Sequence, residues 1–188
     1  MAALITPVGM ISFPHLFDAR AAGPGQDPAY SVSILFDAKA QQSPEYTELR
    51  KAAYAQGVAK WGQDKMKDPA FTRTLRMPFR STDEKQYAGY EDGMTFISAR
   101  TKDRPGVVDA RNQEITVPTD VFPGQLGRLF VSPFAYDRNG NKGISFALNH
   151  VQITKAKMPR LDGRKAATEA FPIYDDGEGD ELDEQIPF

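Results

Sequence analysis

Arginines and lysines alternate with aromatic residues in the middle of this chain. Interleaved cations and rings can hold a polyanionic strand, because cations neutralise phosphates and flat rings stack on unpaired bases. Alternate side chains of a strand share one face, so residues 75–80, and 100–104 if a strand continues that far, would each project their cations on one side. The candidate phosphate contacts are Arg73, Arg76, Arg80, Arg100, Lys102, Arg104 and Arg128.

Four aromatic residues are candidates for base stacking. Tyr87 and Tyr90 lie in a polar loop, and Phe134 and Tyr136 lie on the aromatic and cationic face of a strand whose other face is aliphatic. Either face of that strand can fill the protein interior, so Phe134 and Tyr136 fit stacking and core roles equally, while Phe130 is expected in the core. The alternative for the cations is an ordinary exposed strand face, which often carries scattered arginine and lysine.

The last fourteen residues, 175–188, contain seven carboxylates and neither lysine nor arginine. Without them the chain has 23 Lys+Arg and 18 Asp+Glu, so residues 1–174 carry about +5 although the whole chain carries −2. A tethered acidic segment can occupy a cationic groove and compete with a polyanion for it.

The chain ends in an apolar tip. A tail that only keeps the protein in solution is the alternative, but an exposed Phe188 beside the terminal carboxylate favours binding to a partner. The residues expected to contact such a partner are Asp183, Glu184, Ile186, Pro187 and Phe188.

The sequence contains no recognisable catalytic motif. It has no cysteine, which excludes disulfides and thiolate metal sites, and its two histidines, His15 and His150, are far apart and expected to be structural. P-loop, dinucleotide-binding, nucleophile-elbow and zinc-protease patterns are missing. Acids near strands suit a metal-dependent nuclease, which is the lowest-ranked alternative, but they are not spaced as a metal pair. We therefore expect a protein that is not an enzyme and needs no metal or cofactor.

The chain shows no sign of export or membrane insertion. It has no run of about eighteen apolar residues, and its N-terminus lacks the cationic flank and cleavage site of a signal peptide. We expect a cytoplasmic protein with no membrane partner.

Alternating hydrophobicity predicts several strands and one helix. A helix is expected from Ser43, whose hydroxyl can cap it, through Pro44 at its first position to residue 60 or 61. The Asn139-Gly140 step predicts a hairpin turn, because both residues tolerate positive φ. The expected strands cover 2–13 with breaks, 30–36, 75–80, 94–100, 113–117, 125–136 and 143–155.

This order of elements predicts a mainly β fold, an OB-like Greek-key barrel with one inserted α-helix at about 43–61. The expected organisation is an OB-fold DNA-binding domain at 1–157, a linker at 158–174 and a disordered acidic interaction tail at 175–188.

Turn, glycine and core positions recur at 121–124, 133–137, 140–146, 148–149, 151–152 and 160–164, with Phe171. These segments resemble a bacteriophage family of OB-fold single-stranded DNA-binding proteins, formerly a domain of unknown function. The tail is similar in kind to those of podophage and bacterial single-stranded DNA-binding proteins, in which an acidic segment ending in Phe recruits replication enzymes. If a phage encodes the chain, the expected location is the cytoplasm of its host cell.

The resemblance implies sequence-independent binding of single-stranded DNA in phage replication, recombination or repair. It also implies that the tail recruits replication or recombination proteins. The alternative is a protein-interaction adaptor barrel without DNA binding, and both a monomer and a homodimer remain open.

Overall fold

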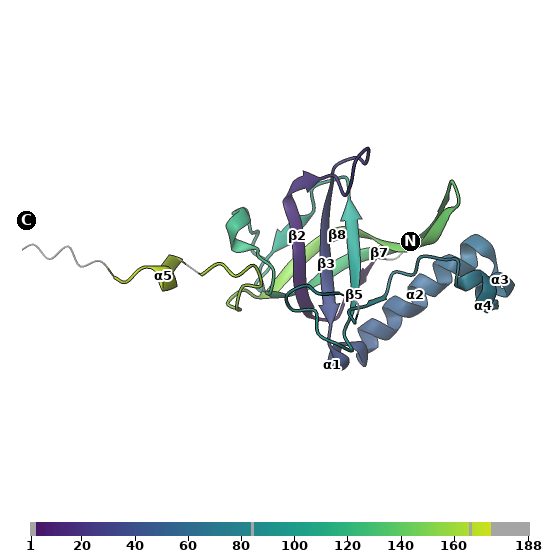
Figure 1. Cartoon of the computed structure of the whole chain (residues 1–188), viewed down its shortest axis with the longest axis horizontal. Helices are drawn as coiled ribbons and strands as arrows, with labels where there is room; N and C mark the ends of the chain where they lie inside the picture. The colour runs from purple at the N-terminus through teal and green to yellow at the C-terminus, as the bar shows by residue number, and fades with distance from the viewer. Residues whose placement is uncertain (1–2, 84, 166, 174–188) are drawn as a thin grey trace, which may run out of the picture.

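Five long strands close into a barrel (Figure 1). The structure is a computed structural model that describes residues 3–83, 85–165 and 167–173. Around the barrel the strands follow the order β2-β3-β5-β8-β7, and β7 pairs with β2 to close it. Their bounds are β2 Gly9–Arg20, β3 Ala29–Phe36, β5 Thr95–Thr101, β7 Leu126–Arg138 and β8 Asn141–Lys155.

The strand directions identify the type of barrel. β5 and β8 are parallel, whereas the pairs β2–β3, β3–β5, β7–β8 and β2–β7 are antiparallel. A five-stranded Greek key in which the third and fifth barrel strands run parallel is an OB-like barrel. The predicted fold class is therefore confirmed.

Three short strands extend the sheet: β1 (Leu4–Ile5) pairs with β7, β4 (Arg80–Ser81) with β5, and β6 (Gly106–Val108) with β8. The predicted strand at 75–80 is wrong except at Arg80, because Arg76 makes an isolated bridge to β8 at Gly143 and Pro78 has no N–H to donate. The predicted strand at 113–117 is also wrong, and only Glu114 bridges there, to Val108.

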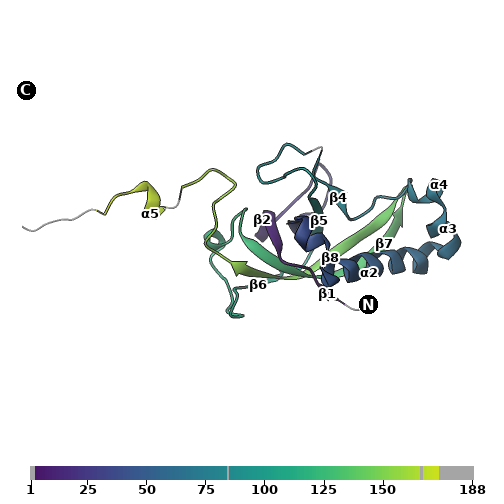
Figure 2. The same cartoon turned by 90° about the horizontal axis from the view of Figure 1, so that it is seen from below.

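The long helix α2 (Pro44–Trp61) matches the prediction at both ends. Ser43 Oγ accepts a hydrogen bond from Tyr46 N at 3.2 Å, which caps the first turn. Tyr46, Leu49 and Ala53 are buried and belong to the barrel core, so the helix lies along β7 and β8 (Figure 2).

The other helices are short. They are α1 (Ala38–Gln41), α3 (Gln63–Lys67), α4 (Pro69–Thr72), the 3-10 turn η1 (Pro118–Asp120) and α5 (Ala167–Ala170). Within the described part of the chain, every helix is too short or too polar to cross a membrane.

The alternation of β7 decides which of its side chains enter the core. Leu129 and Val131 are fully buried inside the barrel, so the residue between them points outward. Phe130 is 36% exposed, and its ring stacks on His150 with centroids 6.1 Å apart. The predicted core position of Phe130 is wrong, because the aliphatic face of β7 fills the interior.

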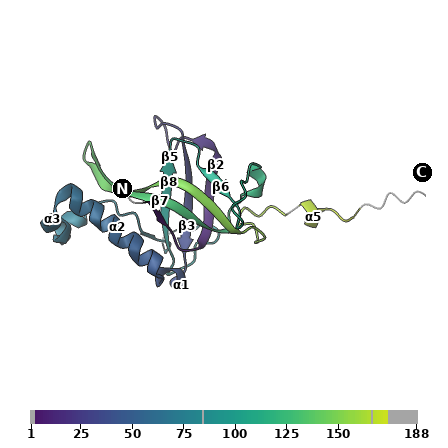
Figure 3. The same cartoon turned by 180° about the vertical axis from the view of Figure 1, so that it is seen from behind.

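The β7–β8 hairpin extends past the barrel as a two-stranded arm. β8 leaves its partner β5 at Phe146, and β7 and β8 stay paired from there to the turn (Figure 3). At the turn, Asn139 and Gly140 adopt φ of 50° and 77°, which confirms the predicted hairpin. We call residues 134–145 the hairpin arm.

Candidate nucleic-acid interface

The outer face of β3 and β5 is polar where the inner face is aliphatic. Val32, Ile34 and Ile97 point into the core, so Ser33 and Ser98 point outward, with their hydroxyls 2.8 Å apart. Arg100 follows on the same face and is exposed. In OB folds the second and third barrel strands, here β3 and β5, form the face that binds oligonucleotides.

Arg80 is held over this face. Its guanidinium donates to Ser98 Oγ at 2.8 Å and lies 4.5 Å from the centroid of the Phe96 ring. β4 positions it, because Arg80 pairs with Phe96 across the sheet. Arg80 is therefore held on the same side of the sheet as Arg100, and both line one groove.

Arg76 also lies beside Arg80, but different elements position it. Its backbone N–H donates to Lys142 O at 3.0 Å and its carbonyl accepts from Ile144 N at 2.9 Å, which fastens it to the hairpin arm. A groove of about 590 Å³ joins these elements. Four predicted site residues line this groove, which we call the arginine groove: Arg76, Arg80, Arg100 and Tyr136.

A second groove of about 540 Å³ continues along the hairpin arm. Phe134 and Tyr136 line it with ring centroids 6.1 Å apart, and Lys60 and Arg138 provide its cations. Tyr136 and Ser145 line both grooves, so the two adjoin. Phe134 and Tyr136 are half-buried on the outer face and do not belong to the core.

Tyr87 and Tyr90 lie between β4 and β5, and Tyr90 contacts Phe96, the ring over which Arg80 lies. Tyr90 packs edge-on against Phe96 and Tyr87, with centroid distances of 5.4 Å and 5.3 Å. Phe13 contacts Tyr87 at 5.3 Å and is 46% exposed. We call Phe13, Tyr87, Tyr90 and Phe96 the aromatic cluster.

Tyr90 is the more buried of the two loop tyrosines. Burial raises the pKa of its hydroxyl, while hydrogen bonds with Ser12 and Ser33 and the nearby charge of Arg80 act in the opposite direction. The hydroxyl thus stays protonated at neutral pH and the ring carries no charge that would repel phosphate.

The remaining predicted cations lie elsewhere. The strand β5 ends at Thr101, so Lys102 and Arg104 do not continue the row that begins at Arg100. Lys102 forms an exposed ion pair with Asp27 at 2.7 Å, and Arg104 lies 5.6 Å from the centroid of the Phe17 ring.

Arg73 and Arg128 are also apart from the grooves. Arg73 is exposed in the turn after α4. Arg128 donates from Nε to Gln152 Oε1 at 2.7 Å on β8, in a network that Gln152 extends to Asn112. The predicted partner-binding residues Asp183, Glu184, Ile186, Pro187 and Phe188 lie outside the described residues.

The sequence prediction missed three residues of this surface. Phe13 is exposed because β2 is irregular there: its φ is 47° and the register with β3 shifts between Ser12 and His15. Lys60 and Arg138 enter through the meeting of α2 with the hairpin arm. Arg138 directly precedes the Asn139-Gly140 turn, and a positive charge next to a predicted hairpin turn could have identified it.

Comparison with known proteins finds the same fold in solved structures. The single-stranded DNA-binding protein from bacteriophage Enc34, solved in complex with ssDNA, has the same fold at 18% identity, with a TM-score of 0.67 over 82% of this chain and 87% of that one. Another structure of the single-stranded DNA-binding protein from bacteriophage Enc34 gives a TM-score of 0.64 at 19% identity, over 88% of each chain.

A second phage protein shares the fold. The gp2.5 single-stranded DNA-binding protein of bacteriophage T7 gives a TM-score of 0.52 at 15% identity, over 88% of this chain and 98% of that one. A search of curated proteins finds no match. The sequence model of the Enterobacter phage Enc34 ssDNA-binding proteins matches residues 2–183, nearly the whole chain. This chain therefore belongs to the Enc34 ssDNA-binding protein family.

Proposed function

We propose that this protein binds single-stranded DNA without preference for base sequence. The observation that carries the proposal is the run of two adjoining grooves that share Tyr136, one lined by arginines and the other by aromatic rings. Membership of a family described as ssDNA-binding supports it. So does the shared fold with a protein solved in complex with ssDNA.

The chemistry of the grooves suits an unpaired strand. Arg76, Arg80 and Arg100 would contact phosphates, which are the same at every nucleotide. Phe134 and Tyr136 would stack on bases, an interaction worth about 1 to 3 kcal/mol per base and open to all four because each base has a flat face. In a duplex the base faces are already stacked on one another, so the rings favour single strands.

The acidic tail would make binding responsive to partners. Its seven carboxylates would compete with DNA for the cationic grooves, and DNA would release residues 183–188 for replication or recombination proteins. The role is then to coat strands during phage replication, recombination or repair. We propose no catalytic step and no cofactor for the protein.

A titration of fluorescein-labelled oligo-dT of about 16 nucleotides tests the proposal by anisotropy. If four to six phosphates are neutralised, log affinity should fall with log salt at a slope of roughly −3 to −4. The Arg80→Ala/Arg100→Ala variant should bind about 10- to 100-fold more weakly, since a hydrogen bond to a charged group contributes about 1.5 kcal/mol or more. Its salt slope should be shallower by about 1.4.

Arg50→Ala on the exposed side of α2 is the control, because it removes one arginine charge outside both grooves. Equal affinity for duplex of the same length, or no binding by the wild type, would contradict the proposal. Failure of a tail-deleted chain to bind oligo-dT would instead support an adaptor barrel. Magnesium-dependent shortening of the labelled strand that a chelator prevents would identify a nuclease.

A further inference from the structure

A third cavity, of about 660 Å³, lies beyond the aromatic cluster on the β2 side of the barrel. Phe13 and Tyr87 of the cluster form one of its walls. The opposite wall comes from the segment before β7 and from residues 160–164, which follow the last barrel strand. We call it the β2 cavity.

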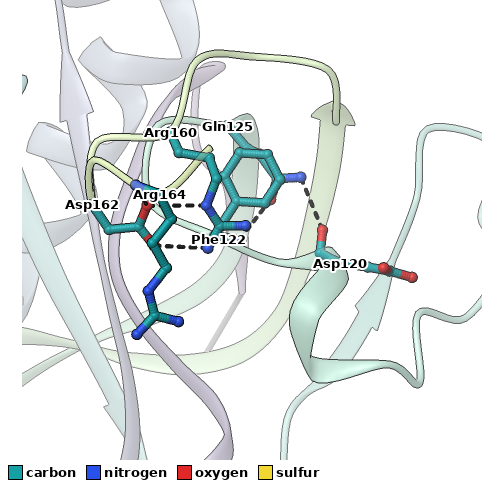
Figure 4. Close-up of polar contacts among 6 residues, drawn as sticks. All are labelled: Asp120, Phe122, Gln125, Arg160, Asp162 and Arg164. Atoms are coloured by element: carbon teal, nitrogen blue, oxygen red, sulfur yellow. Dashed lines mark hydrogen bonds and ion pairs between the residues drawn. The ribbon is translucent and has the colours of Figure 1, made fainter. Parts of the chain in front are cut away.

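The wall after β8 is built into the barrel. Gln125 is fully buried, and its side chain donates to Asp120 O at 2.9 Å and Ala156 O at 3.1 Å while accepting from Phe122 N at 3.0 Å. Leu161 N donates to Pro123 O at 3.0 Å. Figure 4 shows the Gln125 bonds to Asp120 and Phe122. The bond from Leu161 to Pro123 holds the start of the predicted linker against the barrel.

Arg160 gives this wall a fixed cation. Its guanidinium lies 4.4 Å from the centroid of the Phe122 ring and donates to both carboxylate oxygens of Asp162, at 3.0 Å and 2.7 Å. Asp162 Oδ1 also accepts from the backbone N–H of Arg164 at 3.1 Å. Figure 4 shows the Arg164 guanidinium extending away from this pair.

The charge of the β2 cavity is positive. Its lining contains Arg20, Arg160 and Arg164 against Asp162, a formal balance of +2. Burial, reinforced by the charge of Arg20, lowers the pKa of His15, so this imidazole is neutral at pH 7. Among residues 3–83, 85–165 and 167–173, neither Arg20 nor Arg164 forms an ion pair.

We propose that the β2 cavity is a second subsite for the DNA strand. The proposal rests on the proposed function. The strand would cross the β3–β5 face at Arg80, pass the aromatic cluster and enter the cavity, where Phe13 and Tyr87 stack on a base and Arg20 and Arg164 contact phosphates. The cavity is continuous with the face through Phe13 and Tyr87, and its charge is complementary to a polyanion.

The subsite makes a prediction that depends on DNA length. OB folds cover about 4 to 16 nucleotides, so an oligo-dT of about 6 nucleotides should occupy the arginine groove alone, whereas one of about 16 should reach the β2 cavity. Arg20→Ala/Arg164→Ala should weaken binding of the longer strand about tenfold and leave the shorter one unchanged. For the longer strand the salt slope should become shallower by about 1.4.

Three comparisons separate the outcomes. Arg20→Lys/Arg164→Lys keeps both charges and should retain most of the affinity, and Arg50→Ala should bind both lengths like the wild type. Unchanged affinity of the alanine variant for the longer strand, or an equal loss at both lengths, would overturn the subsite. In these titrations, a wild type that fails to bind either strand would instead overturn the proposed function. Melting curves verify that each variant is folded.

Discussion

Arg80 and Lys102 carry the same charge but differ in what holds them. Arg80 is fixed by the Ser98 hydroxyl and the Phe96 ring, so less side-chain entropy is lost when it meets a phosphate. Lys102 pairs with Asp27 at the surface, where both side chains are 76% exposed, and must give up that pair to bind anything else. Of the two, Arg80 is expected to contribute more to DNA affinity.

The Arg160–Asp162 pair gives a prediction about pH. The hydrogen bond from Arg160 lowers the pKa of Asp162 to about 2, from an ordinary value of 3.8. Because the pKa is lower in the folded chain, the contribution to stability is present above pH 3.8 and is lost as pH falls towards 2. A carbon-13 NMR titration of the Asp162 carboxyl should have its midpoint near 2.

Arg160→Gln is the partner experiment, because it removes the largest cause of the shift. The midpoint of Asp162 should then rise towards 3.8. A wild-type midpoint already near 3.8 would show that Arg160 does not hold this carboxylate in solution, and would remove one support of the β2 cavity wall.

At the scale of elements, the arginine groove depends on how closely residue 76 approaches β8. Gly143 makes the approach possible: a Cβ there would lie 2.4 Å from Arg76 O and 2.8 Å from the Tyr136 hydroxyl. One of these atoms belongs to the backbone, so the contact cannot be relieved by rotating a side chain. The glycine thus brings two groove residues from separate elements together.

Gly143→Ala should therefore lower the free energy of unfolding by about 1 to 3 kcal/mol, the range for overpacked sites. It should also weaken DNA binding, since it displaces Arg76. Denaturant unfolding and the oligo-dT titration measure the two effects. Gly23→Ala is the matched control, because its Cβ would meet only Gln26 Nε2, at 3.9 Å; equal stabilities for the two variants would disprove the argument.

Elements with local signals were predictable. The Ser43 cap with Pro44 located the start of α2, and Asn139-Gly140 located the hairpin, because both signals act within four residues. The segment 75–80 misled because its alternation resembles a strand, whereas its actual partners are Gly143 and β5. The alternation of residue types along one segment does not show which strand the segment pairs with.

The sequence predicted which types of residue line the candidate site, but not which of them lie together in space. The arginine groove unites Arg76, Arg80, Arg100 and Tyr136, which lie up to 60 residues apart in the chain, so only the closed barrel brings them together. Phe13 could not be assigned, since its exposure comes from a positive φ that its residue type does not favour. The side of the barrel on which Arg128 lies depends on the same closure.

For the whole molecule, body and tail carry opposite charges, and the attraction between opposite charges depends on salt. Residues 1–174 carry about +5, and the seven carboxylates of the last fourteen residues reverse the sign of the total. Screening acts over about 30 Å at 0.01 M salt and about 8 Å at 0.15 M. Any competition between tail and DNA must therefore be strongest at low salt.

Deleting Asp175–Phe188 should tighten binding of oligo-dT at low salt, on the order of tenfold, and the difference should shrink as salt rises. Anisotropy titrations of both chains across a salt series measure it. A full-length chain with the seven tail carboxylates changed to amides is the control and should behave like the deletion. Equal affinities at all salt concentrations would rule out competition by the tail.

Two strand pairings that close the barrel, which we call its seams, join residues that the ribosome adds at different times. β2 meets β7 at Gly9↔Gly127, and β5 meets β8 at Ala99↔Phe146, so neither seam can form until the last barrel strands leave the ribosome. At 5 to 20 residues per second, the interval between Thr101 and Lys155 lasts roughly 3 to 11 s. During it the nascent chain lacks the strands that cover its apolar inner face and the tyrosine that joins its grooves. Chaperones can therefore engage these exposed apolar strands while the chain is still being made.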